Sequence, residues 1–140
     1  MTEHKFYGIK PEFLTNDFIA GFIVGEGTFY WTKYGNKKIP VFALRVHIRD
    51  FDLLINIKYS LGLREKVYEY VNNGRHAAFL IVRSFESLKK IIETIYPHLT
   101  GHKKIQFVQW FHGFGQKDLD ERYKTIYRIF KQKFPELYLL

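Results

Sequence analysis

One carboxylate in the chain stands out because of the residues on either side of it. Glu26 lies between Gly25 and Gly27, where a stretch with helical spacing gives way to a β-like run. A carboxylate at the bottom of a tightly packed helix can lie beside the same carboxylate of a partner helix. Two such carboxylates repel each other strongly unless cations neutralise them. This arrangement favours a divalent metal site at Glu26.

The residues before Glu26 predict the helix that positions it. Thr15 or Asn16 can accept a hydrogen bond from the unpaired amides of the first turn. Asp17 places a negative charge in that turn, where the helix dipole favours it. Apolar residues then recur at helical spacing, at Ile19, Phe22 and Ile23.

Two glycines inside this predicted helix require an explanation. Gly21 and Gly25 each cost roughly 1 kcal/mol relative to alanine in a helix interior. Because they are four residues apart, they lie on one face and allow another backbone to approach very closely. The spacing therefore predicts a close contact with a second helix.

Residues 18–29 closely resemble the signature of the LAGLIDADG homing endonucleases, commonly Y-L-A-G-F-I-D-G-E-G-S-F. Here the stretch reads F-I-A-G-F-I-V-G-E-G-T-F. Val24 departs from the signature by replacing its first acidic letter. The second acidic letter, which binds the catalytic metal in the family, is Glu26. The alternative interpretation is an ordinary buried helix with a glycine C-cap.

Composition and charge narrow the function classes. The chain has 140 residues and is expected to form one domain, 1–140, with a formal net charge of +8. Such a charge favours a polyanionic partner, although ribosomal, membrane-surface and nuclease domains share it. The absence of cysteine excludes disulfides and thiolate zinc sites. We expect a soluble protein without a signal peptide or membrane span. The composition is rich in lysine, isoleucine, tyrosine and phenylalanine, which fits an AT-rich genome. The compartment stays open between an organelle and a prokaryotic cytoplasm.

The run 39–49 shows clear strand alternation. Its apolar face consists of Phe42, Leu44, Val46 and Ile48. Its other face becomes increasingly basic along the strand and consists of Val41, Ala43, Arg45, His47 and Arg49. One face is therefore expected to pack on a core and the other to meet something wet, either solvent or nucleic acid. A two-stranded ribbon fits the major groove, where arginine can bind guanine bidentately.

The remaining pattern predicts an α+β domain of αββαββα type, with one antiparallel sheet and helices packed on one face. Asp50 is expected to cap the second helix and Gly62 to end it. Two strands, 66–71 and 77–83, are joined by a hairpin turn at 72–74. The strands and helices are expected at 28–34, 39–49, 51–60, 66–71, 77–83, 85–96, 105–113 and 118–134.

Further basic and aromatic residues are candidates for contact with DNA. Lys66, Tyr68 and Tyr70 share one strand face, and the family register suggests that this face meets DNA. Arg75 and His76 at the hairpin tip are either phosphate contacts or part of an exposed turn. The phase of residues 77–82 stays open because they are apolar on both faces. Near the N-terminus, Lys5 and Lys10 either contact the phosphate backbone of DNA or belong to a solvated arm.

Two further segments are similar to the family, so that the resemblance covers about 14–112. In one, residues 49–62 resemble the family's Q-K-D-x-x-L-L-x-x-I-x-x-x-F-G, and Ile48 occupies the position of its glutamine, a polar residue near the active site. Either His47 or Arg49 could substitute for it, or the site is tuned differently. In the other, residues 97–105 resemble P-L-L-T-x-K-K, which carries a lysine close to the scissile phosphate. Counting from Pro97 assigns that position to His102, followed by Lys103 and Lys104. The resemblance implies a catalytic role for His102 or Lys103 and a DNA contact for Lys104.

The resemblance implies a site-specific, intron-encoded endonuclease that cleaves both strands of a long, nearly palindromic DNA target. Glu26 and the carbonyl of Gly25 would hold divalent ions, expected to be Mg²⁺. A homodimer would form through Gly21, Phe22 and Gly25, because a single motif supplies only half of a helix pair. Two alternatives use the same fold: a splicing maturase that binds intron RNA, and a DNA-binding protein that does not cleave.

Overall fold

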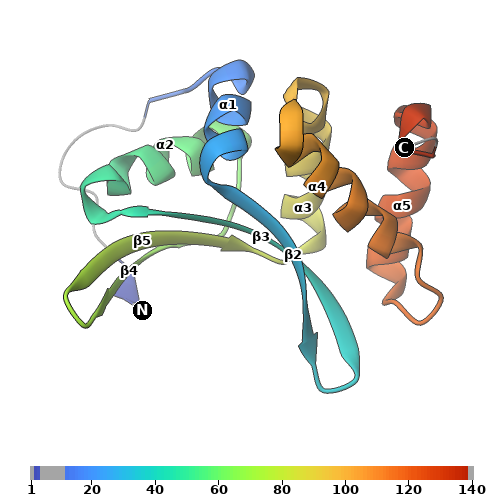
Figure 1. The fold of residues 1–140 in the computed structure, drawn as a ribbon, viewed down its shortest axis with the longest axis horizontal. Coiled ribbons are helices and arrows are strands. Elements are labelled where there is room, and N and C mark those ends of the chain that lie inside the picture. The colour runs from blue at the N-terminus through green and yellow to red at the C-terminus, as the bar shows by residue number, and fades with distance from the viewer. Residues whose placement is uncertain (1, 4–11, 139–140) are drawn as a thin grey trace.

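The computed structural model describes residues 2–3 and 12–138, and Lys5 and Lys10 lie outside these residues. The protein is an α+β fold, as the sequence predicts (Figure 1). Its sheet has the strand order β1-β4-β5-β3-β2, with every neighbouring pair antiparallel. The strands are β1 (Thr2–Glu3), β2 (Gly27–Tyr34), β3 (Lys37–His47), β4 (Val67–Asn72) and β5 (Arg75–Val82). The α-helices are α1 (Asn16–Glu26), α2 (Phe51–Leu61), α3 (Phe85–Ile95), α4 (Gly101–His112) and α5 (Glu121–Lys133).

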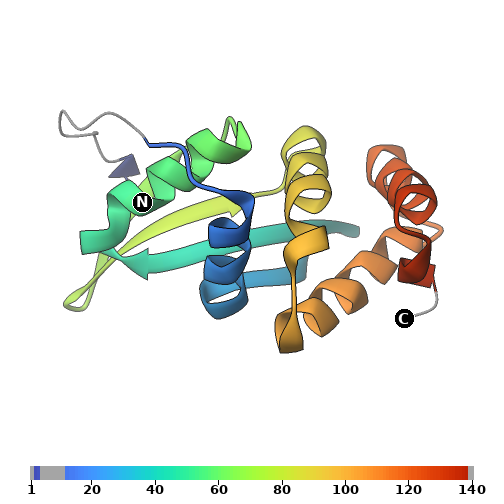
Figure 2. The same cartoon turned by 90° about the horizontal axis from the view of Figure 1, so that it is seen from above.

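The helices lie on one side of the sheet. Helices α1, α2 and α3 lie over the sheet, and α4 and α5 extend this layer to one side (Figure 2). On the other side the sheet curves into an arch, with the β4–β5 hairpin descending at one end and the β2–β3 hairpin at the other (Figure 1). We call this uncovered side of the sheet the open face.

Strand alternation separates the core from the open face as expected. Phe42, Leu44, Leu80 and Val82 are fully buried beneath the helices. Phe42 pairs with Val82, and Leu44 pairs with Leu80, so the same phase runs through both strands. The register thereby settles the orientation of β5, which the sequence left open. Phe79 and the other odd-numbered residues of β5 lie on the open face.

Local hydrogen bonds explain where most helices begin. The Thr15 hydroxyl accepts a hydrogen bond from the Phe18 amide at 3.2 Å, and Ser84 caps α3 in the same way. Asp120 accepts from the Arg122 amide at 2.9 Å and starts α5. Gly62 ends α2 with a φ of 68°, a conformation in which glycine carries no steric penalty.

Some expected boundaries are wrong. Strand β3 ends at His47 rather than at residue 49, because the His47 ring accepts a hydrogen bond from the Arg49 amide and opens a short 3-10 turn. Asp50 makes no side-chain cap for α2. Helix α4 begins at Gly101, four residues before the expected start. Helix α5 begins only at residue 121, because Asp120 is its cap.

Two tryptophans attach α4 to the edge of the sheet. The Trp31 indole donates to the carbonyl of Trp110 at 3.1 Å, and the Trp110 indole donates to the carbonyl of Tyr30 at 3.0 Å. Gly113 leaves room for this contact, since a Cβ at that position would lie 2.5 Å from the Trp31 ring. This double attachment fixes the position of α4 relative to the start of β2.

Candidate functional site

Glu26 is the last residue of α1, and the chain passes directly from it into β2 (Figure 1). Its side chain is exposed and has no hydrogen bond or ion pair within residues 12–138. A helix ends with carbonyl groups that have no partner one turn further on, and its C-terminus carries partial negative charge. The Glu26 carboxylate adds to this charge, so this end of α1 favours a cation.

Close packing at this junction requires Gly27 but not Gly25. A Cβ on Gly27 would lie 2.7 Å from the Ile23 Cγ2 and 2.9 Å from the Ile23 carbonyl oxygen. A Cβ on Gly25 would meet nothing within 4 Å. Gly27 is therefore needed for the turn from α1 into the sheet. Nothing in the described part of the chain requires glycine at position 25.

The outer surface of α1 carries a stripe that the rest of the described chain covers only at Phe22, which is half-buried against the core. The stripe consists of Phe18, Gly21, Phe22 and Gly25, which recur at helical spacing. Phe18 is 49% exposed, and a Cβ on Gly21 would meet no described atom within 4 Å. The low helix propensity of the two glycines is thus not offset by packing inside the described chain.

Lys103 reaches the same end of α1 from the first turn of α4. Its ammonium donates a hydrogen bond to the carbonyl of Gly27, the residue directly after Glu26. It also donates to the side-chain oxygen of Gln106 at 2.9 Å. His102, which counting along the chain assigns to this place, is exposed and makes no hydrogen bond to any described residue. The structure therefore places the Lys103 ammonium at the backbone of the residue that follows Glu26.

Most of the expected DNA contacts lie together on the open face. One row across the sheet contains Arg45, Phe79 and Tyr68, which are paired in register. The Arg45 guanidinium lies 5.5 Å from the centre of the Phe79 ring. The next row contains His47, Ala77 and Tyr70.

The β4–β5 hairpin divides its two tip residues between the faces. Arg75 follows the alternation of Ala77 and Phe79 and is therefore on the open face. His76 lies on the opposite face, where its ring is 3.1 Å from the Glu69 carboxylate. At the other end of β4, Lys66 is exposed and shares a hollow with Tyr68.

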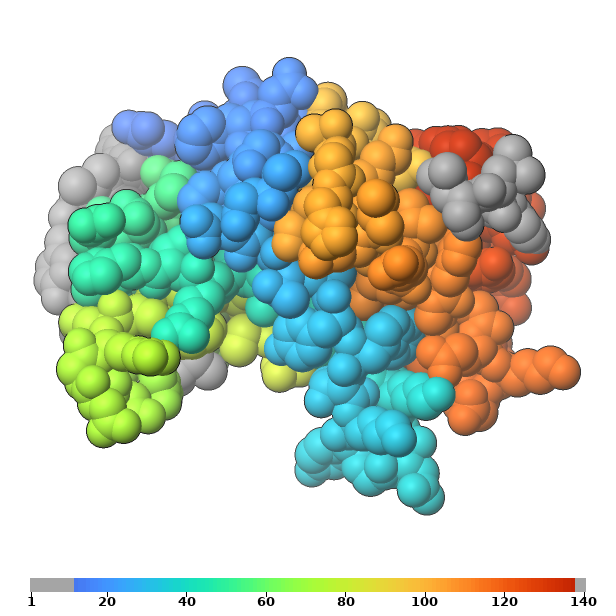
Figure 3. All heavy atoms as spheres, in the orientation of Figure 1, coloured from blue at the N-terminus to red at the C-terminus, as the bar shows by residue number. Residues whose placement is uncertain are grey.

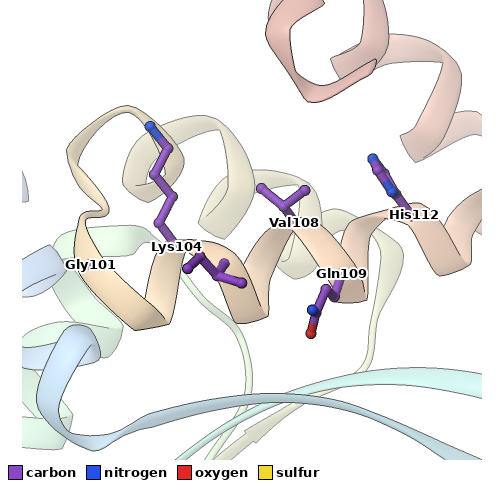
Figure 4. A pocket seen from close by; sticks show the side chains of 6 residues that line it. Gly101, Lys104, Val108, Gln109 and His112 are labelled. Atoms are coloured by element: carbon purple, nitrogen blue, oxygen red, sulfur yellow. The ribbon is translucent and has the colours of Figure 1, made fainter. Parts of the chain in front are cut away.

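Two expected DNA contacts are not brought to the open face. Arg49 is exposed in the 3-10 turn after β3. Lys104 points away from the sheet into a hollow of about 540 Å³ along α4, which also contains Val108 and His112 (Figure 4). The Lys104 ammonium lies 5.7 Å from the centre of the Tyr96 ring.

Comparison with protein families identifies the family of this chain. A family model described as LAGLIDADG endonuclease covers residues 19–112, from the first turn of α1 to the last residue of α4. The chain belongs to the LAGLIDADG endonuclease family.

Solved structures of two homing endonucleases and of a LAGLIDADG meganuclease share the fold. The homing endonuclease I-TnaI is 21% identical, with 90% of this chain and 99% of that chain covered and a TM-score of 0.61. The archaeal intron-encoded homing endonuclease I-Vdi141I, complexed with DNA, is 26% identical over 69% and 64% of the two chains, with a TM-score of 0.58. The meganuclease I-AabMI, bound to uncleaved DNA, is 21% identical over 75% of this chain but only 38% of its own, with a TM-score of 0.62.

The sequence analysis expected DNA contacts on 39–49 but missed those on the outer part of the β2–β3 hairpin, which we call the arm. Figure 3 shows this arm and the β4–β5 hairpin projecting from the body with a recess between them. The arm presents Tyr30, Tyr34 and Lys37, and Tyr34 is 79% exposed. The alternation of threonine and tyrosine at positions 28, 30, 32 and 34 is the signal that could have identified it.

The residues present can accommodate magnesium but not a closed protein cage. No three histidine, cysteine, aspartate or glutamate side chains gather as a metal site in the described residues. Magnesium usually keeps several waters and binds one or two carboxylates together with substrate phosphates. Glu26, exposed beside the last carbonyls of α1, fits that requirement.

Among the helices of the described residues, none is long and apolar enough to cross a bilayer.

Proposed function

We propose that the protein is a homodimeric, site-specific DNA endonuclease that hydrolyses phosphodiester bonds with the help of divalent metal ions. The observation that carries this proposal is the position of Glu26. Its carboxylate is exposed and unpaired among the described residues, and the Lys103 ammonium binds the carbonyl of Gly27, the next residue in the chain. The family relationship and the DNA complexes of I-Vdi141I and I-AabMI support DNA as the substrate.

The stripe on α1 supports a homodimer. Phe18, Gly21, Phe22 and Gly25 would pack against the same residues of a second copy, because a two-fold interface pairs a surface with itself. The two glycines would let the helices approach closely, which brings the two Glu26 carboxylates together. This chain covers 99% of I-TnaI, so I-TnaI is about the length of one such unit. It covers only 38% of I-AabMI, which is therefore more than twice as long as the part that matches.

The open face supports DNA as the partner because its charge and shape suit a duplex. Two hairpins border the arched open face (Figure 1). By strand register and exposure, this face carries Arg45, Lys66, Arg75 and Lys37. These cations would contact phosphates or guanine edges, and the tyrosines would add apolar and hydrogen-bonding contacts. Two-fold symmetry of the dimer would make the preferred target nearly palindromic.

Each residue of the candidate catalytic site has a distinct role in this proposal. Glu26 and the Gly25 carbonyl would hold Mg²⁺, which when bound stabilises charge on the phosphate and activates water. Lys103 would place a positive charge near the phosphate and stabilise the developing negative charge. His102 would lie at the solvent side and contribute weakly to the local field.

One observation favours a protein that binds DNA without cutting it. Ile48, at the position of the family's glutamine, is half-buried and packs against the core. It therefore offers no polar group to the site. His47, which precedes Ile48 at the end of β3, is the neighbouring polar residue that could replace the glutamine. Its ring nitrogen Nδ1 already accepts a hydrogen bond from the Arg49 amide.

Cleavage of a defined duplex tests the proposed function. The substrate is the coding locus of the chain with the intervening sequence removed, incubated with purified protein with and without Mg²⁺. We expect a double-strand break that requires Mg²⁺ and falls at least about 100-fold in Glu26→Gln, with DNA binding retained. Glu121→Gln, on the far helix α5, is the matched control and should cleave normally.

Other outcomes would overturn the proposal. Tight binding without a break in the unmodified protein would support the non-cleaving alternative. Preference for intron RNA over the duplex would support a maturase. Cleavage that persists at full rate in Glu26→Gln would remove this carboxylate from the mechanism.

A further inference from the structure

The side chain of Gln106 holds the ammonium group of Lys103. The two residues are three apart on α4, and the Lys103 Nζ lies 2.9 Å from the Gln106 Oε1. Gln106 is half-buried and lines a hollow next to Thr28 and Trp110. It is not part of the family signature quoted above, and sequence reasoning did not identify it.

The chemistry of the pair fixes how the glutamine is turned. A lysine ammonium donates hydrogen bonds and accepts none, so the atom facing it must be the amide oxygen of Gln106. The ammonium has three donors, and two are used by the Gln106 oxygen and the Gly27 carbonyl. Among the described residues the third donor has no acceptor. It is free for a group that arrives with the substrate.

We propose that Gln106 is a positioning residue, which fixes the Lys103 ammonium at the Gly27 carbonyl, one residue after Glu26, so that its free N–H meets the reacting phosphate. This inference rests on the proposed nuclease function. A lysine side chain has four rotatable bonds and would otherwise occupy many conformations. Two acceptors, one on β2 and one on α4, restrict it to one position before DNA binds, which lowers the entropy lost in the reaction.

A neutral amide suits this purpose better than a carboxylate. Glutamine holds the ammonium without cancelling its positive charge, whereas glutamate at position 106 would neutralise it and repel the phosphate. Gln106→Glu should therefore keep Lys103 in place and still reduce the cleavage rate. Gln106→Leu should reduce the rate for a different reason, because the ammonium is then free to move.

The first experiment separates DNA binding from the chemical step. We expect Gln106→Leu to lower the single-turnover cleavage rate by about 10–100-fold, while the Kd for the target duplex changes by less than about threefold. Gln109→Leu is the matched control, since Gln109 lies on the same helix, is exposed and makes no hydrogen bond to Lys103. It should leave both quantities unchanged.

A double-mutant cycle tests whether Gln106 acts through Lys103. If it does, Gln106→Leu should have no further effect on the rate in a Lys103→Met background. Independent, multiplicative losses would overturn the proposal. An unchanged rate in the single variant Gln106→Leu would also overturn it.

A second measurement needs no cleavage activity. Nitrogen-edited NMR of the lysine ammonium groups, with Lys103 assigned from Lys103→Met, should show slow proton exchange in the unmodified protein and in Gln109→Leu. The slow exchange should be lost in Gln106→Leu. Slow exchange that survives in Gln106→Leu would contradict the proposal. If the unmodified protein does not cleave but the NMR result holds, the nuclease function fails while the contact between Gln106 and Lys103 stands.

Discussion

Glycine has two different purposes at the end of α1, and substitution should separate them. Gly27→Ala should lower the free energy of unfolding by about 1–3 kcal/mol, because the new Cβ would clash with the Ile23 carbonyl. Gly25→Ala meets no described atom within 4 Å and should leave that energy unchanged or raise it by up to about 1 kcal/mol. Urea unfolding of the two variants at low protein concentration measures the difference. Equal destabilisation by both substitutions would contradict this account.

The sequence proposes Glu26 as the metal-binding carboxylate and leaves two candidates, His102 and Lys103, for the cation near it. Counting from Pro97 assigns the catalytic position to His102, whereas Lys103 makes the contact with Gly27. The choice depends on the rotation of α4 about its axis, which the contact between Trp31 and Trp110 fixes. Both tryptophans are visible in the sequence, but nothing in their spacing shows that they pair.

At the scale of elements, the arm formed by β2 and β3 gives a test of the open face. Lys37→Ala should weaken DNA binding and reduce the slope of log K against log salt by about one, because one phosphate contact is lost. Lys90→Ala is the control, since Lys90 is on α3 in the helix layer and binds the Gly62 carbonyl at 2.7 Å. Binding titrations at several salt concentrations measure both slopes. Equal effects of the two substitutions would contradict a role for the arm.

Apolar residues at strand and helix spacing predict most of the strands and helices, but not the residues at which they end or the curvature of the sheet. From Phe42 to His47 the pattern separates the more buried from the more exposed residues as predicted, but Val41, on the face expected to be wet, is fully buried. The strand ends at His47 because its ring accepts a hydrogen bond from the Arg49 amide, a local event without a signature in the apolar pattern. The arch of the sheet is a property of all its strands together. For that reason Tyr30, Tyr34 and Lys37, on the arm, were not identified as candidates for DNA contact.

At the scale of the whole molecule, Tyr96 links the helix layer to the C-terminal segment and makes stability depend on pH. Its side chain is 3% exposed, and its hydroxyl donates to the Glu136 carboxylate at 3.2 Å. Burial, together with that carboxylate, raises the pKa of Tyr96 to about 12 from 10.0. In this range the folded protein keeps the proton that the unfolded chain loses. Stability is therefore full below pH 10 and falls as the pH rises towards 12.

Replacement of this tyrosine tests the link. Urea unfolding of Tyr96→Phe should show a weaker fall in stability above pH 10 than the unmodified protein shows. Some fall should remain, because burial also raises the pKa of Tyr123. An identical pH dependence in both proteins would contradict the assignment to Tyr96.

The association of two copies through α1 tests the account most directly. Gly21→Leu adds bulk where the described chain leaves open space, so the folded subunit should keep its thermal stability. Sedimentation velocity with the target duplex and Mg²⁺ should show two subunits per duplex for the unmodified protein. For Gly21→Leu it should show a single subunit and no double-strand break. Cleavage by a single subunit, or a Gly21→Leu protein that still pairs and cuts, would contradict the claim that two Glu26 side chains act together.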